Sequence, residues 1–237
     1  VSCQFGWIQV IGCLYELVIS HLMTELNDIL PIDLKESFDS LDYEESDGLT
    51  VQSIRYLDNE LHFDFSIFLG DVEQNETQHW RLQVLNYRDS KIDIGNLGSY
   101  FKFYSDHFLL WEFTDNLTEL YFKKESNHPE YLLADIYSIH NSVFDNFIKL
   151  EKFINGNNLL SLCKSNTGLF GRGPKRILKY YFDSLTKAGK EPYYFGDYIA
   201  KKWDGEKWIP EDNDLKVAIL GGTYFLGQTF NFKRLDK

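Results

Sequence analysis

The sequence has few cysteines and prolines and a low mean hydropathy, and each of these shortages excludes a class of protein. Three cysteines in 237 residues are too few for a disulfide-stabilised scaffold. Five prolines exclude a collagen-like fibre, and a mean hydropathy of −0.33 argues against a membrane protein. Because 43% of the residues are hydrophobic and 25% are charged, the chain can form a packed core. The length fits one large domain or two small ones.

Aromatic residues are abundant and alanine is scarce. The chain has 19 Phe, 15 Tyr and 5 Trp, whereas alanine, a strong helix former, occurs only at Ala134, Ala188, Ala200 and Ala218. Aromatic side chains favour pleated, half-buried surfaces, so we expect a fold that contains β-structure. The codon bias of an AT-rich genome is an alternative explanation for the same composition.

The first 22 residues differ from the remainder of the chain. They contain no Lys or Arg, and they hold two of the three cysteines. A secretory signal would need a basic start and a small-residue cleavage site, and neither is present. Since Met23 is the only methionine, we interpret residues 1–22 as a non-native upstream extension; an amphipathic membrane-associating helix is the alternative. Cys163 would then be the sole cysteine, which favours the reducing cytoplasm.

The net charge of −12 is unevenly distributed along the chain. Residues 1–150 hold 26 Asp and Glu against 9 Lys and Arg, whereas residues 151–237 hold 10 against 15. The acidity is densest from Glu25 to Glu76. Such asymmetry indicates something about binding partners, although it says nothing about the fold.

The pattern of residues 23–126 predicts an acidic, β-rich region. Leu61, Phe63, Phe65 and Ile67 alternate with polar residues, as in a strand with one buried face. The expected strands are Leu49–Leu57, Leu61–Leu69, a segment around Trp80–Val84, Lys91–Ile94, Tyr100–Tyr104, Phe108–Phe113 and Leu117–Phe122. We therefore expect an antiparallel sheet or sandwich-like arrangement.

Residues 127–237 predict a basic α+β region packed on the first, or continuous with it. Pro129 can begin a helix, and further short helices are expected over Phe147–Ile154 and Asn158–Cys163. The clearest helix runs from Pro174 to Ala188. Two terminal hairpins are expected, one with a type I′ turn at Asp204–Gly205 and one at Gly221–Gly222. The predicted fold class is thus α+β, with a sheet region followed by helices and β-hairpins.

The segment SNTGLFGRGPKR, residues 165–176, is the best candidate for a ligand site. Its glycines permit close backbone approach, and the helix that follows offers free N–H groups at its N-terminus. We expect a loop that binds a phosphate or carboxylate, although an ordinary surface loop before a helix explains the same pattern. The candidate ligand-binding residues are Gly171, Arg172, Gly173, Lys175 and Arg176.

Other suggestive patterns have ordinary explanations. His62, Asp64 and Ser66 share one strand face without converging, so we interpret them as a solvated surface. The acidic stretch before Gly48 fails the calcium-loop register, because Tyr43 and Ile54 stand where Asp and Glu are needed. No histidine or cysteine spacing predicts a metal, no cofactor is expected, and nothing requires an enzyme. Basic residues interleave with aromatics after Arg172, as in single-strand binders, but the acidic total argues against nucleic acid.

The leading hypothesis is a soluble, cytoplasmic, bacterial protein that binds a basic macromolecular partner through an acidic face, for example as an immunity-like or antitoxin-like inhibitor. The alternatives are an enzyme or small-ligand protein that uses the anion site, and a structural subunit of a larger assembly. The candidate partner-binding residues are Asp39, Asp42, Glu44, Glu45 and Asp47.

Overall fold

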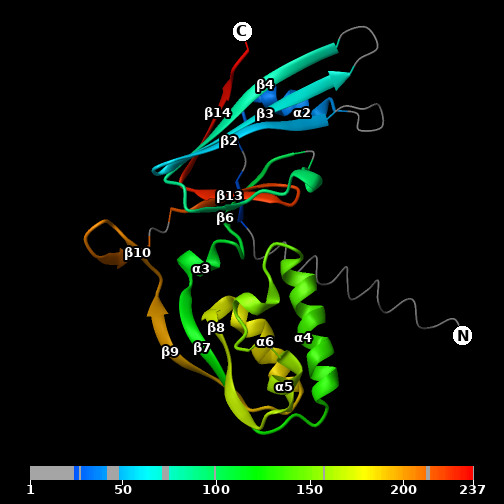
Figure 1. Cartoon of the computed structure of the whole chain (residues 1–237), viewed down its shortest axis with the longest axis vertical. Helices are drawn as coiled ribbons and strands as arrows, with labels where there is room; N and C mark the ends of the chain where they lie inside the picture. Colours follow the sequence, from blue (N-terminus) through cyan, green and yellow to red (C-terminus); the bar gives the residue numbers. More distant parts are fainter. Residues whose placement is uncertain are drawn as a thin grey trace, which may run out of the picture. The chain divides into compact units, whose positions relative to one another are not determined.

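The computed structural model describes residues 24–26, 28–41, 48–70, 75–98, 100–156, 158–211 and 214–236. They form two compact units (Figure 1). The first combines Met23–Asp106 with Asp214–Lys237 and is called the split unit; the second, His107–Asn213, is called the central unit. The division thus falls after residues 106 and 213, whereas the sequence suggested a border at 126/127. The proposed extension, residues 1–22, lies outside the described residues.

The fold is α+β and consists mostly of sheet, with 27% helix and 44% strand in several antiparallel sheets. The fold class expected from the sequence is confirmed at this level. No helix in the described part of the chain is both long and apolar enough to span a membrane.

The split unit contains a four-stranded antiparallel sheet in the order β14-β4-β3-β2. The alternation expected in β3 is present: Leu61, Phe63, Phe65 and Ile67 are completely buried on one face. In the register of β3 with β4, Trp80 pairs with Phe65, Leu82 with Phe63 and Val84 with Leu61. The turn at Asp58–Asn59 joins β2 to β3, as the sequence predicts. The strands are β2 (Gly48–Leu57), β3 (Glu60–Gly70), β4 (Asn75–Leu85) and β14 (Thr229–Arg234).

A five-stranded sheet in the order β1-β6-β12-β13-β5 completes the split unit. The rings of Phe63 and Phe225 lie 5.0 Å apart, and together with α2 (Ile32–Asp39) both sheets contribute to one hydrophobic core. The predicted turn at Gly221–Gly222 joins β12 to β13. The remaining elements are β1 (Thr24–Glu25), β5 (Asp89–Lys91), η2 (Ile94–Asn96), β6 (Lys102–Asp106), β12 (Lys216–Leu220) and β13 (Thr223–Gly227).

The central unit is built on a three-stranded antiparallel sheet in the order β8-β7-β9, with β7 (Asn116–Lys123), β8 (Thr167–Pro174) and β9 (Pro192–Ile199). Helix α6 (Lys175–Lys187) packs on all three strands, and α4 (Pro129–Phe144) packs on α6 (Figure 1). The other elements are α3 (Trp111–Thr114), η3 (Leu150–Lys152), α5 (Leu159–Lys164), β10 (Lys201–Trp203) and β11 (Trp208–Pro210).

The helices of the central unit begin and end where local chemistry dictates. Pro129 opens α4, and the Asn158 side chain caps α5 by accepting a hydrogen bond from the Ser161 N–H at 3.0 Å. Helix α6 buries an apolar stripe that includes Ile177 and Tyr181. It ends before Gly189, whose φ of 79° is a conformation that glycine adopts without strain.

Several local predictions are wrong. The helix expected over Phe147–Ile154 is reduced to η3, and Ile154 forms an isolated bridge with Gly171. Residues Phe108–Phe113 form turns and α3 instead of a strand. Phe108–Trp111 are buried in succession, so their burial does not alternate as it would in a strand with one buried face. The segment before the Pro174 helix, expected to be a loop, forms strand β8 over Thr167–Pro174, and β9 was not predicted from the sequence. The Asp204–Gly205 hairpin is real, but its register pairs Trp203 with Trp208 and leaves a four-residue loop. Asp204 Oδ1 accepts hydrogen bonds from the N–H groups of Glu206 and Lys207. These bonds favour the four-residue loop over a type I′ turn.

A buried histidine gives the central unit a pH-dependent stability. His140 Nε2 donates to the Ile148 carbonyl oxygen at 2.8 Å, and Nδ1 accepts from the Tyr181 hydroxyl at 2.8 Å. This arrangement requires a neutral ring, and burial lowers the pKa of His140. In the unfolded chain the imidazole protonates near pH 6.5, so stability is full above that pH and falls as pH is lowered toward the folded-state pKa.

We therefore expect the unfolding free energy to drop by about 1 kcal/mol more between pH 7.5 and pH 5.5 in the native protein than in His140→Gln. Urea denaturation at the two pH values measures this difference. The exposed His128→Gln is the matched control and should keep the native pH dependence. An equal pH dependence in His140→Gln and the native protein would contradict the assignment.

Candidate functional site

The predicted anion site lies where β8 runs into α6, and the N-terminus of that helix already has an anionic partner. The Arg176 N–H donates to Asp115 Oδ2 at 2.8 Å, while Pro174 at the cap position offers no side-chain hydrogen bond. A carboxylate at this position satisfies an otherwise unbonded N–H and interacts favourably with the helix dipole. Asp115 therefore occupies the place that a ligand phosphate or carboxylate would take.

The glycines of this segment allow close packing against another part of the central unit. A Cβ atom added to Gly171 would lie 2.2 Å from the Phe153 carbonyl oxygen, and one added to Gly173 would lie 2.5 Å from the Phe153 ring. The backbone around Phe153 is thereby able to run along β8, where Arg172 N–H donates to Phe153 O and Asn155 N–H donates to Phe170 O. The glycines serve backbone packing on the edge of β8.

The cations of the predicted site point to different grooves and have partners within the protein. Arg172 Nε lies 2.7 Å from Glu119 Oε1, and the Arg176 guanidinium lies 4.0 Å from the centre of the Trp111 ring. Arg172 and Gly173 line one groove of about 260 Å³, whereas Lys175 and Arg176 line another of about 420 Å³. The five predicted residues adjoin along the chain, but the structure does not bring them around one cavity.

The predicted acidic face is described only in part. Asp39 is exposed at the end of α2, and Asp33 and Glu36 are exposed on the same side of that helix. Leu34 and Phe38 are buried on the other side. The remaining predicted residues, Asp42, Glu44, Glu45 and Asp47, lie outside the described residues.

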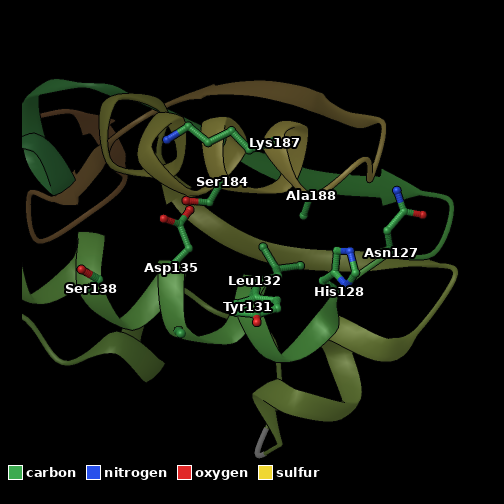
Figure 2. A pocket seen from close by; sticks show the side chains of 10 residues that line it. Asn127, His128, Tyr131, Leu132, Asp135, Ser138, Ser184, Lys187 and Ala188 are labelled. Atoms are coloured by element: carbon green, nitrogen blue, oxygen red, sulfur yellow. The ribbon is translucent and has the colours of Figure 1, made fainter. Parts of the chain in front are cut away.

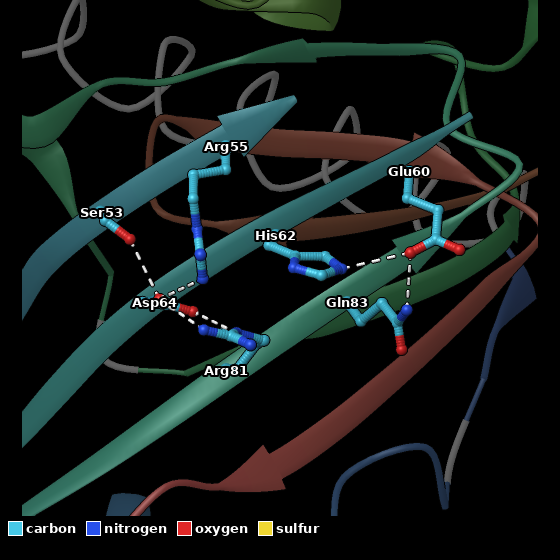
Figure 3. A network of polar contacts seen from close by, with 7 residues as sticks. All are labelled: Ser53, Arg55, Glu60, His62, Asp64, Arg81 and Gln83. Atoms are coloured by element: carbon cyan, nitrogen blue, oxygen red, sulfur yellow. Dashed lines mark hydrogen bonds and ion pairs between the residues drawn. The ribbon is translucent and has the colours of Figure 1, made fainter. Parts of the chain in front are cut away.

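A polar network covers the outward face of the four-stranded sheet (Figure 3), where the sequence suggested a solvated surface. That interpretation is wrong for Ser66, which is 5% exposed, and for Asp64, which is only 9% exposed. Its carboxylate accepts from Arg81 Nε at 2.6 Å and Arg81 Nη2 at 3.0 Å, and also from Arg55 and Ser53. These long arginine side chains cover Asp64, because a buried carboxylate is stable only when it is paired.

The network leaves neither of its carboxylates suited to act as a base. The hydrogen bond from Arg81 is the main cause that lowers the pKa of Asp64. The pKa of Glu60 is also lowered, first by the hydrogen bond from Gln83 and then by that from His62. Ser66 is bonded to His79 Nδ1 at 2.7 Å, away from these groups. The residues His62, Asp64 and Ser66 therefore do not form a catalytic triad.

A groove of about 580 Å³ lies between α4 and α6 of the central unit (Figure 2). The exposed Tyr131 ring contacts His128, and Asp135 and Ser184 point toward one another across the groove. The groove holds no nucleophile bonded to a base. No signal in the sequence marks it, because its lining comes from the ends of two helices that are far apart along the chain.

The buried ionisable side chains near α5 are structural. Burial raises the pKa of the Cys163 thiol to about 11, so it is protonated at neutral pH and is a poor nucleophile. Lys190 is completely buried; its ammonium donates to the Ser165 carbonyl oxygen and lies 4.0 Å from the Phe122 ring centre. In the described ranges, no group of three His, Cys, Asp or Glu could hold a metal ion.

Exposed apolar side chains are concentrated on one segment of the central unit. Six of the 13 large hydrophobic residues exposed in the described part of the chain fall within residues 193–208. The sequence indicated aromatics interleaved with basic residues here, but it could not separate exposed rings such as Tyr193 from buried ones such as Tyr181. The six residues are Tyr193, Phe195, Tyr198, Ile199, Trp203 and Trp208.

Comparison of the chain with protein-family models, with curated proteins and with solved structures finds no match.

The ion pairs of Asp64 make a measurable contribution to the split unit. In Asp64→Asn, Arg81 and Arg55 lose a charged partner on a covered surface, so we expect a loss of about 1–3 kcal/mol in unfolding free energy at pH 7. Because the folded-state pKa of Asp64 is lowered, this contribution is present above about pH 4 and disappears as pH falls through the lowered pKa.

Urea denaturation between pH 7 and pH 3 of the native protein and Asp64→Asn tests this expectation. Glu36→Gln, which removes an exposed carboxylate from α2, should change the unfolding free energy by less than about 0.5 kcal/mol. If Asp64→Asn is no more destabilising than that control, the network is dispensable.

Proposed function

We propose that the protein acts by binding another macromolecule, and that the acidic split unit attracts a basic partner protein. The observation that carries this proposal is the distribution of charge between the two units. The split unit has 20 acidic and 10 basic side chains, whereas the central unit has 15 and 14. A concentrated negative potential steers a basic partner toward the surface and increases its association rate. An inhibitor of a basic toxin nuclease, similar in role to an immunity protein, is one concrete version.

The exposed side of α2 supports this proposal. Its three carboxylates, Asp33, Glu36 and Asp39, have no ion-pair partner among the described residues. In the central unit, by contrast, Glu119 pairs with Arg172, and Glu112 pairs with Lys152. The acidic side chains of α2 can therefore form ion pairs with a cation of another molecule without first breaking an ion pair within the chain.

The buried thiol supports a cytoplasmic location for this function. Cys163 is a free cysteine with no exposed surface. Unpaired thiols are typical of a reducing compartment.

The two alternatives remain predictions. A small-ligand or enzymatic role at residues 171–176 requires an anion to displace Asp115 from the α6 N-terminus or Glu119 from Arg172. A structural subunit would form a complex that survives high salt, whereas a partner held by charge dissociates as ions screen the attraction.

We expect the charge reversal Asp33→Lys/Glu36→Lys/Asp39→Lys to weaken capture of the partner by about tenfold or more at low salt, because it replaces attraction on α2 by repulsion. The measurement is affinity capture from cells of the source organism with the full chain as bait. Proteins retained at low salt and released at high salt are identified by mass spectrometry, and we expect a basic protein among them.

The matched control is Glu125→Lys/Asp145→Lys/Glu206→Lys, which makes the same charge change at exposed positions of the central unit. It should retain the partner better than the α2 variant does. Equal loss in both variants would mean that total charge alone governs binding, and absence of any salt-sensitive basic protein would contradict the proposed function.

A further inference from the structure

The groove between α4 and α6 is lined by side chains that recur at helical spacing. Tyr131, Asp135 and Ser138 lie at positions i, i+4 and i+7 of α4, so they share one side of that helix. Ser184 and Lys187, at positions i and i+3 of α6, share a side in the same way. The two helices therefore direct two sets of polar side chains into one groove.

Small side chains create the space between the two helices. Alanine occurs at only four positions in the chain, and two of them, Ala134 and Ala188, line this groove. Leu132, which is 2% exposed, contributes an apolar wall. A volume of about 580 Å³ is within the range of sites that hold small molecules. The groove thus has the size and the mixed lining of a small-molecule site.

The hydroxyl group of Ser184 is the feature that indicates a ligand. Ser184 is 2% exposed, yet its hydroxyl forms no hydrogen bond with any residue that the structure describes. It points toward Asp135 across the groove (Figure 2). A buried hydroxyl without a partner costs free energy, and a ligand that bonds to it removes that cost.

Two charged side chains of the groove also lack partners. Neither Asp135 nor Lys187 forms an ion pair within the described ranges, with each other or with another residue. In Figure 2 both extend toward the same end of the groove as Ser184, whereas Tyr131 and His128 lie toward the other end. One end of the groove therefore offers a carboxylate, an ammonium group and a hydroxyl, and the remainder is largely apolar.

These groups select the charge of the ligand. A simple cation would be repelled by Lys187, and a simple anion would be repelled by Asp135. A free amino acid is a zwitterion at neutral pH, so it can pair with both. Because it carries no net charge, the net charge of −12 on the chain neither attracts nor repels it at long range.

We infer that this groove binds a free α-amino acid with an apolar side chain. Its ammonium group lies between Asp135 and Ser184, its carboxylate pairs with Lys187, and its side chain extends along Leu132 toward Tyr131. The site belongs to the central unit and goes beyond the proposed function, since it does not use the acidic side of α2.

The probes are L-phenylalanine and L-leucine, each titrated into the full chain at pH 7 and followed by calorimetry. We expect binding, and slower amide hydrogen exchange in the parts of α4 and α6 that line the groove. The matching amine and the matching acid each lack one of the two charges; for phenylalanine they are phenethylamine and hydrocinnamate. Both should bind about tenfold or more weakly than the amino acid.

Asp135→Asn should weaken binding about tenfold or more, because it removes the charge that faces the ligand ammonium and keeps the size of the side chain. Lys187→Gln should lower the affinity for the amino acid toward that for the amine. The matched control is Asp145→Asn, which neutralises an exposed carboxylate at the end of α4 outside the groove and should change binding less than about twofold.

Ser184→Ala keeps the test decisive if Asp135→Asn fails to fold. Its hydroxyl has no bond to lose within the described part of the chain, so the urea midpoint should stay the same or rise. Binding of the amino acid should nevertheless weaken about threefold or more.

Absence of binding by both amino acids at concentrations up to about 10 mM would overturn the inference. An amine or an acid that binds as tightly as the amino acid would also overturn it, because the site would then recognise a single charge. Binding that survives both Asp135→Asn and Ser184→Ala would place the amino acid elsewhere, with the same consequence. None of these results bears on the proposed function, which is tested at α2 by capture of a partner.

Discussion

The central unit depends on the pairing of β7 with a strand on each side. Because β7 is hydrogen-bonded to both β8 and β9, its side chains alternate between the α6 face and the opposite face. Leu120 and Phe122 thereby enter the core, and Tyr121 and Lys123 are held outside it. The same pairing brings β9, which is distant in the chain, beside β7. The exposure of Tyr121 and Lys123 is thus a consequence of how the core is built, since burying one side of β7 leaves the other side outside the core.

The fold also changes what the charge of the chain means. Cut at residue 150, the sequence separates into a strongly acidic and a mildly basic part. In the structure, β12–β14 return to the acidic unit and bring Lys216, Lys233 and Arg234 with them. Two acidic and four basic residues in Asp214–Lys237 therefore reduce the acidity of the split unit, and the central unit is nearly neutral. The contrast between the units is smaller than the sequence suggests, but it is still a contrast between an acidic and a balanced surface.

Sequence patterns predict the elements whose burial is periodic. The alternation through Phe63 and Phe65 identifies β3, and the apolar stripe between Pro174 and Gly189 identifies α6. Elements without such a period are missed: Phe108–Trp111 are buried in succession, and β9 is exposed along most of its length. The candidate site is harder to predict than the secondary structure, because the side chains that bond to its residues are distant in the sequence. Nothing near Arg176 reveals that Asp115, 61 positions earlier, caps its helix.

Most groups that look reactive in the sequence are engaged by the fold. Asp64 is surrounded by donors, Cys163 is a buried thiol with a raised pKa, and His140 is fixed as a neutral ring. A catalytic group needs a free lone pair or an exposed thiolate near a substrate, and these side chains offer neither. The side chains that the fold leaves exposed are instead the carboxylates of α2 and the aromatic side chains within residues 193–208. Charge that attracts at long range and aromatic rings that hold at short range are both common in protein-binding surfaces, and they are the features on which the proposed function rests.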